Sequence, residues 1–142
     1  MSEELTGGGT STVVTFRSEG GLYAFGIETL TEILGDREVT PVPGLPDYVL
    51  GVINLRGEVI PVIDLRRRLG FADAEPTGRE ALFIIEADGV TAAVRADTVV
   101  TSVTYDESSY MAFEEESVAA GIILDGEEQI TLIDPKKLLK ND

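Results

Sequence analysis

The feature that most constrains the fold is a β-hairpin pattern that the chain carries twice. Two apolar segments, Val49–Leu55 and Val59–Ile63, flank Arg56-Gly57. Glycine tolerates the positive φ of tight hairpin turns, so this run predicts strand, turn and strand. The pattern returns in Leu124-Asp-Gly126 and Ile130–Asp134, at offsets of 69 residues between the glycines and 70 between the closing aspartates.

A second pair of hairpins shows the same relationship. Gly20-Gly21-Leu22 and Glu28-Thr-Leu30 are echoed by Asp88-Gly89-Val90 and Asp97-Thr-Val99, at offsets of 68 to 69 residues. The hairpins therefore fall into two matched pairs, which indicates an internal duplication. Each unit has about five short strands and a small capping helix, and so few strands favour a small closed barrel. The expected fold is mainly β, with two such barrels sharing an apolar seam.

The domain organisation follows from the same pattern. Residues 1–11 are polar and acidic, which predicts a flexible tail, and the domain covers 12–140 with halves 12–70 and 80–140. An exchange of strands between the two barrels stays open. The N-terminus lacks the basic and apolar regions of a signal peptide, and no apolar run approaches the ~20 residues of a membrane span. We therefore expect a soluble cytoplasmic protein with no direct membrane insertion.

Some local patterns are less regular. Apolar residues at helical spacing predict a short helix or a helical turn over Ile27–Ile33. Asp97–Val103 fits a short helix or an extended segment, and Tyr105–Ser117 is expected to be irregular and acidic. Asp64 and Asp134-Pro135 are typical helix N-caps. The aromatic residues expected in the core or the seam are Tyr23, Phe25, Tyr105, Tyr110 and Phe113.

The absence of cysteine and histidine excludes several kinds of chemistry. A disulfide scaffold, a thiolate zinc site and a cysteine nucleophile are excluded, and the commonest general base is missing. A small hydrolase on a β-barrel is the alternative from another class, and it would need a nucleophile with a base. We expect no catalytic residues, no metal and no cofactor.

The charge balance limits the partners. The net charge is −15, from 26 acidic and 11 basic residues, which opposes binding to nucleic acid or to anionic membranes. Eight of the bases are arginine and three are lysine. Heavy acid loading with little lysine suits a high-salt cytoplasm, because salt screens self-repulsion. A halophilic source is therefore a hypothesis, which stability measured against KCl would test.

The differences between the two copies are candidates for function. Arg56 at the first turn corresponds to Asp125 at the second, and Glu32 corresponds to the uncharged region near Thr101. An exposed arginine beside a glycine turn is a typical interface anchor, with an ordinary surface arginine as the alternative. An ion pair with Glu32 would hold the Arg56 side chain in place.

Two charge runs favour structural interpretations. Arg66-Arg67-Arg68 could form a basic patch, but cations at the end of a helix complement its dipole. Glu114–Glu116 could bind a metal, but no calcium-loop pattern surrounds it, which favours a solvated acidic face.

The central run resembles the signature of a known family. Pro41-Val-Pro-Gly44 followed by Leu50-Gly-Val-Ile-Asn-Leu-Arg-Gly-Glu-Val-Ile-Pro-Val-Ile-Asp-Leu65 is similar to the CheW family of chemotaxis coupling proteins. Tyr23-Ala-Phe25 before this run and Leu132–Leu138 after it fit the same pattern, so the resemblance covers about 12–140. It implies two five-stranded SH3-like β-barrels.

The resemblance also implies a function and a set of contact residues. Proteins of this family are non-catalytic adaptors that bind the regulatory domain of the histidine kinase CheA and the cytoplasmic tip of methyl-accepting chemoreceptors. They are thereby recruited to membrane receptor arrays. By position, Arg56 matches an arginine implicated in receptor coupling. The other implied protein-binding residues are Leu30, Glu32 and Ile33 after the first helix, and Leu82, Ala93 and Gly121 in a groove between the barrels.

The chain departs from the family pattern at two places. Arg95 stands where an aliphatic residue is common, and the segment 104–120 is short and acidic. Two alternatives remain open: a detached kinase regulatory domain, and a CheW-like adaptor for another output such as surface motility or gene regulation. A whole kinase would need a phosphorylatable histidine, which the chain lacks.

Overall fold

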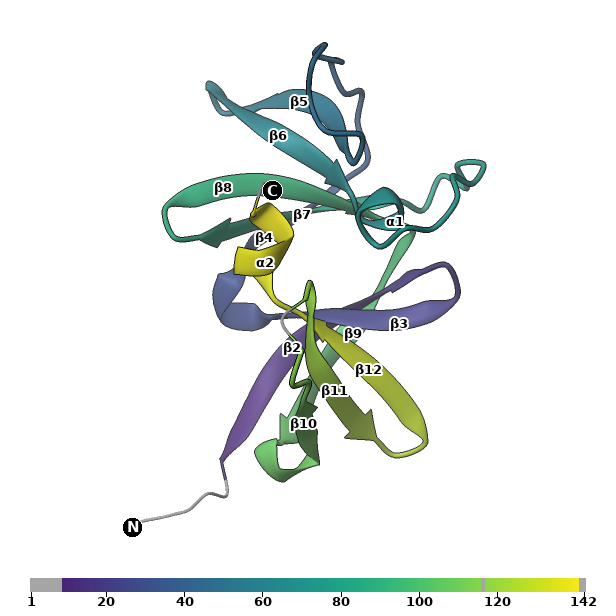
Figure 1. Cartoon of the computed structure of the whole chain (residues 1–142), viewed down its shortest axis with the longest axis vertical. Helices are drawn as coiled ribbons and strands as arrows, with labels where there is room; N and C mark the ends of the chain where they lie inside the picture. The colour runs from purple at the N-terminus through teal and green to yellow at the C-terminus, as the bar shows by residue number, and fades with distance from the viewer. Residues whose placement is uncertain (1–8, 116, 141–142) are drawn as a thin grey trace.

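The chain folds into two β-sheets that pack against each other (Figure 1). The computed structural model describes residues 9–115 and 117–140. The six-stranded sheet has the order β10 (Tyr110–Ala112), β11 (Ala119–Asp125), β12 (Glu128–Ile133), β3 (Gly21–Gly26), β2 (Thr10–Ser18) and β9 (Thr98–Asp106). The five-stranded sheet has the order β4 (Leu30–Gly35), β7 (Ala81–Ala87), β8 (Val90–Ala96), β6 (Glu58–Asp64) and β5 (Val49–Leu55). The helices are η1 (Ile27–Thr29), α1 (Leu65–Arg68), η2 (Glu107–Ser109) and α2 (Pro135–Leu139).

Each sheet takes strands from both halves of the chain. The hairpin β2–β3 pairs with β9 and β12, and the hairpin β7–β8 pairs with β4 and β6. The strand pairs β3–β12 and β6–β8, which join the two halves of the chain, are parallel, while the other strand pairs are antiparallel. Apart from β10, the strand order β11-β12-β3-β2-β9 therefore matches β5-β6-β8-β7-β4 element by element, as two copies related by a pseudo-two-fold axis would. Neither half of the chain builds a complete sheet by itself.

The five-stranded sheet closes on itself at its two edges, β4 and β5. Thr40, which follows β4, exchanges two backbone hydrogen bonds with Val52 of β5, each 2.9 Å long. Closure removes open strand edges, which are sites of unwanted pairing. It also brings the end of the β5–β6 hairpin close to β4.

An aromatic cluster fills the interface between the sheets. The rings of Phe16 and Phe25 from the six-stranded sheet lie 4.8 and 5.9 Å from the ring of Phe83 in the five-stranded sheet, centroid to centroid. All three side chains are fully buried. Each such side chain stabilises the fold by about 1.5–3 kcal/mol relative to its exposed state. The predicted apolar seam is confirmed, and each sheet also encloses its own smaller apolar cluster.

The two α-helices begin as predicted. Asp64 accepts a hydrogen bond from the backbone N–H of Arg66 at 3.1 Å, and Asp134 accepts one from that of Lys136 at 2.9 Å. Both aspartates therefore cap helix N-termini, and Pro135 occupies the first turn of α2.

Several local predictions were wrong. Of the short helix or helical turn predicted over Ile27–Ile33, the turn is present as η1, but it ends at Thr29 because Leu30 already pairs with Ile85 in the β4–β7 ladder. Pairing along a strand overrides helical spacing in so short a segment. For Asp97–Val103, the extended alternative is confirmed, since Thr98 begins β9. Tyr105–Ser117 is more regular than expected, because it contains the end of β9, η2 and β10.

Two further boundaries differ from the predictions. Strand β2 begins at Thr10, inside the predicted tail 1–11, and residues 1–8 lie outside the described part of the chain. Phe113 is 42% exposed and does not belong to the core. The other aromatic predictions are confirmed: Phe25 is buried, and Tyr23, Tyr105 and Tyr110 pack against apolar clusters.

The hairpin turns also correct the sequence alignment of the two copies. The first turn is at Glu19-Gly20, one residue before the predicted position, and Arg56-Gly57 and Asp88-Gly89 share its two positive φ values. Such pairs form type I′ turns. The fourth turn is at Gly126-Glu127, of which only Gly126 has a positive φ.

Strand register fixes which residues are equivalent. Leu55 pairs with Glu58 around the Arg56 turn, and Asp125 pairs with Glu128 around the fourth turn. The residue at the position of Arg56 is therefore Gly126, and the predicted equivalence with Asp125 was wrong. Matching the glycines had shifted the alignment by one residue, because the two turns are of different types.

Candidate functional site

Arg56 lies at the tip of the β5–β6 hairpin, with its side chain 69% exposed. Its φ of 53° is tolerated in a type I′ turn, and the Asn54 side chain supports the turn by accepting a hydrogen bond from the Gly57 N–H at 2.9 Å. The backbone therefore presents the guanidinium at a fixed point. In Figure 1 this turn and the β7–β8 turn project on the same side of the molecule.

Glu32 on β4 holds the Arg56 side chain in one orientation. Arg56 Nη2 donates to Glu32 Oε1 at 2.8 Å, and Nη1 donates to Oε2. A two-point contact of this kind fixes the plane of the guanidinium. The predicted Arg56–Glu32 pair is confirmed, and closure of the five-stranded sheet explains how residues from its two edges meet.

The pair is ionised at neutral pH. The hydrogen bond from Arg56 lowers the pKa of Glu32 below its ordinary value of 4.5, and the hydrogen bond to Glu32 raises the pKa of Arg56. The stabilising contribution of the carboxylate is therefore present above its ordinary pKa and is lost as pH falls through the lowered value. Because Arg56 is exposed and Glu32 is only partly buried, solvent screens the pair, which orients the arginine rather than stabilising the fold.

The Arg56–Glu32 pair lies in an open cleft of about 560 Å³. Carboxylates of Glu58 and Glu86 share the cleft, and its apolar lining is Leu55 and, beneath the surface, the buried Ile84. The complete lining is Thr31, Glu32, Leu55, Arg56, Gly57, Glu58, Ile84, Glu86 and Thr91. Such a surface, with one fixed cation beside apolar groups, suits recognition of another protein.

The neighbouring residues on β4 point in different directions. Leu30 packs against the apolar cluster between the sheets, whereas Ile33 is 39% exposed. Successive residues of a strand face opposite sides, so Ile33 and Glu32 belong to different faces. The structure brings Glu32 to Arg56 and leaves Ile33 as an accessible apolar group.

The predicted groove residues lie elsewhere. Leu82 and Ala93 have no exposed surface, because β7 and β8 are central strands whose inner side chains fill the five-stranded sheet. Gly121 is buried in the other sheet, where an added Cβ would overlap the carbonyl oxygen of Met111. The prediction that these residues line a groove was wrong, because neither side chains nor a Cβ at these positions can reach a partner.

Sequence reasoning missed other accessible residues around the cleft. Glu58, Glu86 and Thr91 line the cleft, while Val59 is 64% exposed on the face of β6 opposite Glu58. Val59 and Ile60 both look like core residues in the sequence. The strict alternation of a half-buried strand would have placed Val59 outside once Ile60 was placed inside.

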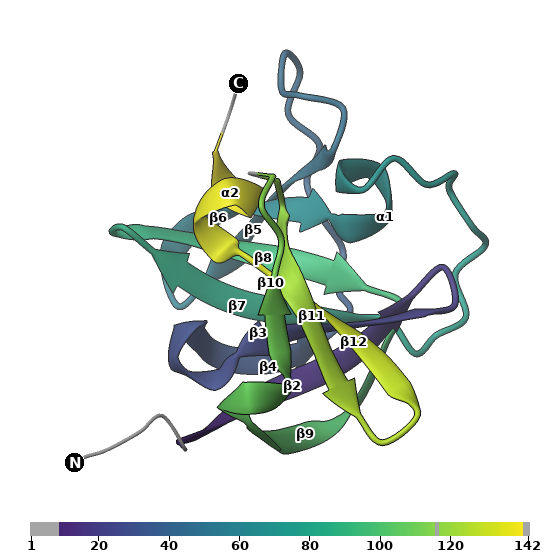
Figure 2. The ribbon, with the colours of Figure 1, turned by 60° about the horizontal axis from the view of Figure 1, so that its bottom comes forward.

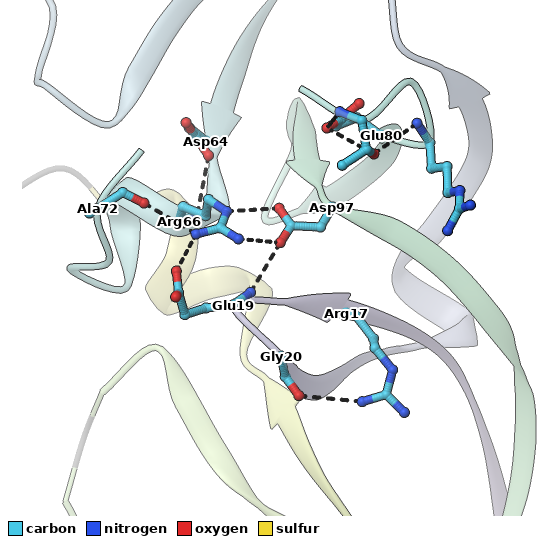
Figure 3. Close-up of polar contacts among 10 residues, drawn as sticks. Arg17, Glu19, Gly20, Asp64, Arg66, Ala72, Glu80 and Asp97 are labelled. Carbon is cyan, nitrogen blue, oxygen red and sulfur yellow. Dashed lines mark hydrogen bonds and ion pairs between the residues drawn. The ribbon is translucent and has the colours of Figure 1, made fainter. Parts of the chain in front are cut away.

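The run Arg66-Arg67-Arg68 is structural. The side chain of Arg66 donates to Asp97 at 2.7 and 3.0 Å and also contacts Glu19 and the carbonyl of Ala72 (Figure 3). These partners connect α1 with the β2–β3 turn of the six-stranded sheet. The structural interpretation of the arginine run is confirmed, although it works through ion pairs as well as through the helix end.

The other arginines of this region are also engaged. Arg67 donates two hydrogen bonds to Asp73, at 2.9 and 3.0 Å. Arg68 donates to the carbonyls of Lys137 and Leu138 in α2, at 3.0 and 3.2 Å, and thereby ties α1 to α2.

Two remaining charged positions have simple explanations. Arg95, which departs from the family pattern, pairs with Asp36 at 3.0 Å. Glu114 and Glu115 are exposed, and Glu116 lies outside the described residues. Within residues 9–115 and 117–140, no group of three acidic side chains is arranged to hold a metal ion.

The comparisons with known proteins agree with this architecture. Residues 12–142 match the family model of the CheW-like domain. The chain belongs to the CheW family. A chemotaxis protein CheW of Rhizobium meliloti (strain 1021) is 36% identical over 106 residues, which cover 75% of this chain and 68% of the relative. One of Bacillus subtilis (strain 168) is 34% identical over 121 residues, covering 85% and 74%.

A solved CheW structure supports the fold in detail. The scaffolding protein CheW from Thermoanaerobacter tengcongensis superposes with a TM-score of 0.89 at 27% identity, covering 94% of this chain and 95% of that one. The predicted fold class, two SH3-like β-barrels, is confirmed, with a short sixth strand, β10, in one of them. In the described part of this CheW-family chain, no helix is long and apolar enough to cross a membrane.

Proposed function

We propose that this CheW-family protein couples methyl-accepting chemoreceptors to the histidine kinase CheA, and that it binds both without catalysing a reaction. The observation that carries the proposal is Arg56, which is exposed at a hairpin tip and held by Glu32 at the edge of a cleft. The names of the relatives support the chemotaxis role. The match of Asn54-Leu-Arg-Gly57 to the family signature supports the receptor role of the arginine.

The proposed mechanism is binding through a small number of anchor residues. A helix of the receptor tip would bind across the cleft, with apolar side chains against Leu55. A carboxylate or carbonyl of that helix would accept a hydrogen bond from Arg56, whose orientation Glu32 fixes beforehand. Prior orientation reduces the entropy that binding must remove. Through its receptor and kinase contacts the protein would be recruited from the cytoplasm to membrane receptor arrays.

Replacement of Arg56 by Asp tests this function. Because Arg56 is exposed and its turn tolerates aspartate, Arg56→Asp should leave the melting temperature nearly unchanged. It should abolish receptor-dependent control of kinase activity, measured as CheA autophosphorylation with receptor fragments and the purified variant. Arg79→Asp, an equal charge change at another exposed arginine, is the matched control and should couple normally.

A charge exchange separates orientation from recognition. In the double variant Glu32→Arg/Arg56→Glu the ion pair can form again, but the cation is on the other strand. We expect binding to kinase fragments in a pull-down and no coupling to receptors. Full coupling by this variant or by Arg56→Asp, or unfolding of Arg56→Asp, would refute the assigned role of Arg56.

A further inference from the structure

All three lysines of the chain lie in or next to α2, although the net charge is −15. They border a cleft of about 420 Å³ between α2 and the β7–β8 hairpin. The cleft also contains the carboxylates of Asp88 and Asp134 and the apolar side chains of Val90 and Leu139. Val90 is 49% exposed, so the cleft combines accessible apolar surface with cations.

The equivalent surface on α1 shows what such a cleft can bind. Counted from the two N-caps, Arg66 and Arg67 of α1 correspond to Lys136 and Lys137 of α2. The connector that follows α1 runs along this surface in an irregular conformation. Its Ala72 carbonyl accepts a hydrogen bond from Arg66 at 3.2 Å, and its Asp73 carboxylate binds Arg67. In Figure 2 the connector forms the long loop beside α1.

The surface of α2 is more open in the described part of the chain. Lys136 lies 3.6 Å from Asp88, with the two side chains 66% and 71% exposed. Lys140 is exposed as well. Arg68 holds the carbonyl end of α2, so the helix is a fixed support for these lysines. An exposed ion pair such as Lys136–Asp88 contributes little and can exchange partners.

We propose that the cleft between α2 and the β7–β8 hairpin binds an extended acidic segment of a partner protein, in the way that the connector binds α1. Carboxylates of the segment would pair with Lys136 and Lys140, and its apolar side chains would contact Val90 and Leu139. The charge contrast supports this choice, because the three lysines of the cleft outnumber its two aspartates, whereas an acidic segment is repelled by most of the rest of the molecule. The site is separate from Arg56 and does not depend on the function proposed for it.

An acidic peptide provides a direct test. The probe is a capped peptide with the connector sequence, residues 70–78, titrated into the isotope-labelled full chain and followed by NMR. We expect saturable shifts at Val90, Lys136 and Leu139, and weakening at higher KCl because salt screens exposed charges. The same peptide with Asn and Gln in place of Asp73 and Glu75 should cause no shifts.

Paired variants complete the test. Lys136→Glu/Lys140→Glu should weaken peptide binding about tenfold or more, since two ion pairs become repulsive. Arg37→Glu/Arg79→Glu, which changes the net charge equally at exposed sites elsewhere, should bind as the parent does. Equal shifts with the neutral peptide, equal losses in both double variants, or binding of phosphatidylserine vesicles in place of the peptide would overturn the proposal.

Discussion

Each copy of the repeat places a short helix, α1 or α2, beside a hairpin turn, but the cations of the two helices have different surroundings. At α1, the Arg66 side chain is 15% exposed and contacts Asp97 as well as Glu19. At α2, the equivalent Lys136 is 66% exposed and forms an ion pair with Asp88 at 3.6 Å. Glu19 and Asp88 are themselves equivalent, since each is the first residue of a type I′ turn. Duplication has conserved the sign of both charges and changed their surroundings.

This difference shows how surroundings decide the role of a charge pair. A guanidinium binds several acceptors in fixed directions, so Arg66 joins the β2–β3 turn, the β8–β9 junction and the connector. An ammonium on a flexible chain in solvent makes a weaker contact. The contacts of Arg66 at α1 therefore stabilise the fold, whereas the ammonium of Lys136 at α2 stays accessible to a partner.

A second equivalent pair, Gly51 and Gly121, behaves alike in both copies. Each lies at a register shift at the start of a strand, where another segment crosses closely. An added Cβ would overlap the Thr40 carbonyl at Gly51 and the Met111 carbonyl at Gly121. Closure of both sheets requires glycine at these positions, so here the duplication has preserved the residue as well as its role.

The largest expected effect is at these glycines. Gly51→Ala should destabilise the fold by about 3 kcal/mol or more, because Gly51 has a φ of 150° and a Cβ would meet backbone atoms. Gly121→Ala should cost about 1–3 kcal/mol, since its φ is not positive and part of the overlap is with the movable Tyr110 ring. Urea unfolding measures both.

Gly35→Ala is the control for this pair. Gly35 has open space where a Cβ would lie, and we expect a change within about 0.5 kcal/mol. Similar small changes for Gly51→Ala and the control would show that sheet closure does not depend on glycine.

The next effect compares the two helix cations. Arg66→Ala should destabilise the fold by about 2 kcal/mol, since it removes both guanidinium donors from the partly buried Asp97 and leaves that carboxylate with the backbone N–H of Glu19. Lys136→Ala should change stability by less than about 0.5 kcal/mol, because its ion pair is exposed. Thermal and chemical unfolding of both variants at one salt concentration measure the difference. Equal losses of stability in the two variants would show that Arg66 and Lys136 do not differ in their contribution to the fold.

The smallest effect is a pH-dependent release of the connector from α1. The hydrogen bond from Arg67 lowers the pKa of Asp73 below its ordinary value of 3.8. Its contribution is therefore present above that value and is lost as pH falls through the lowered pKa. NMR from about pH 5 to about pH 3 should show the amides of the connector changing before those of α2.

The variant Asp73→Asn is the control for the pH experiment. It should remove this step and leave the amides of α2 unaffected. Parallel changes at both helices in the parent chain would mean that the acid transition is global rather than local to α1.

Much of the fold could be predicted because hairpins are local. Alternating apolar residues and glycine turns identify the paired strands, and Asp64 and Asp134 identify the helix starts. The prediction failed at Leu30–Ile33, where pairing with β7 over a long sequence distance decides the conformation. It also failed at the fourth turn, where register rather than the position of a glycine sets the equivalence of Arg56 with Gly126.

The residues of the candidate site could also be predicted only in part. Arg56 could be selected because a charged residue interrupts the best apolar pattern, and its pairing with Glu32 could be anticipated. Leu82 and Ala93 could not be placed, because an apolar residue on a strand looks the same in sequence on the inner and the outer face. The cleft at α2 was not anticipated, since it depends on a helix and a hairpin that are distant along the chain.

The sequence by itself therefore determined the duplication, the hairpins, the helix caps and the position of Arg56 at a hairpin turn, because each depends on residues close together in the chain. The tertiary structure alone decided how the two halves share strands, which apolar residues are enclosed, and which charges find partners. These outcomes depend on contacts between distant segments. For that reason Arg66 and Lys136, equivalent in the sequence repeat, differ so much in burial.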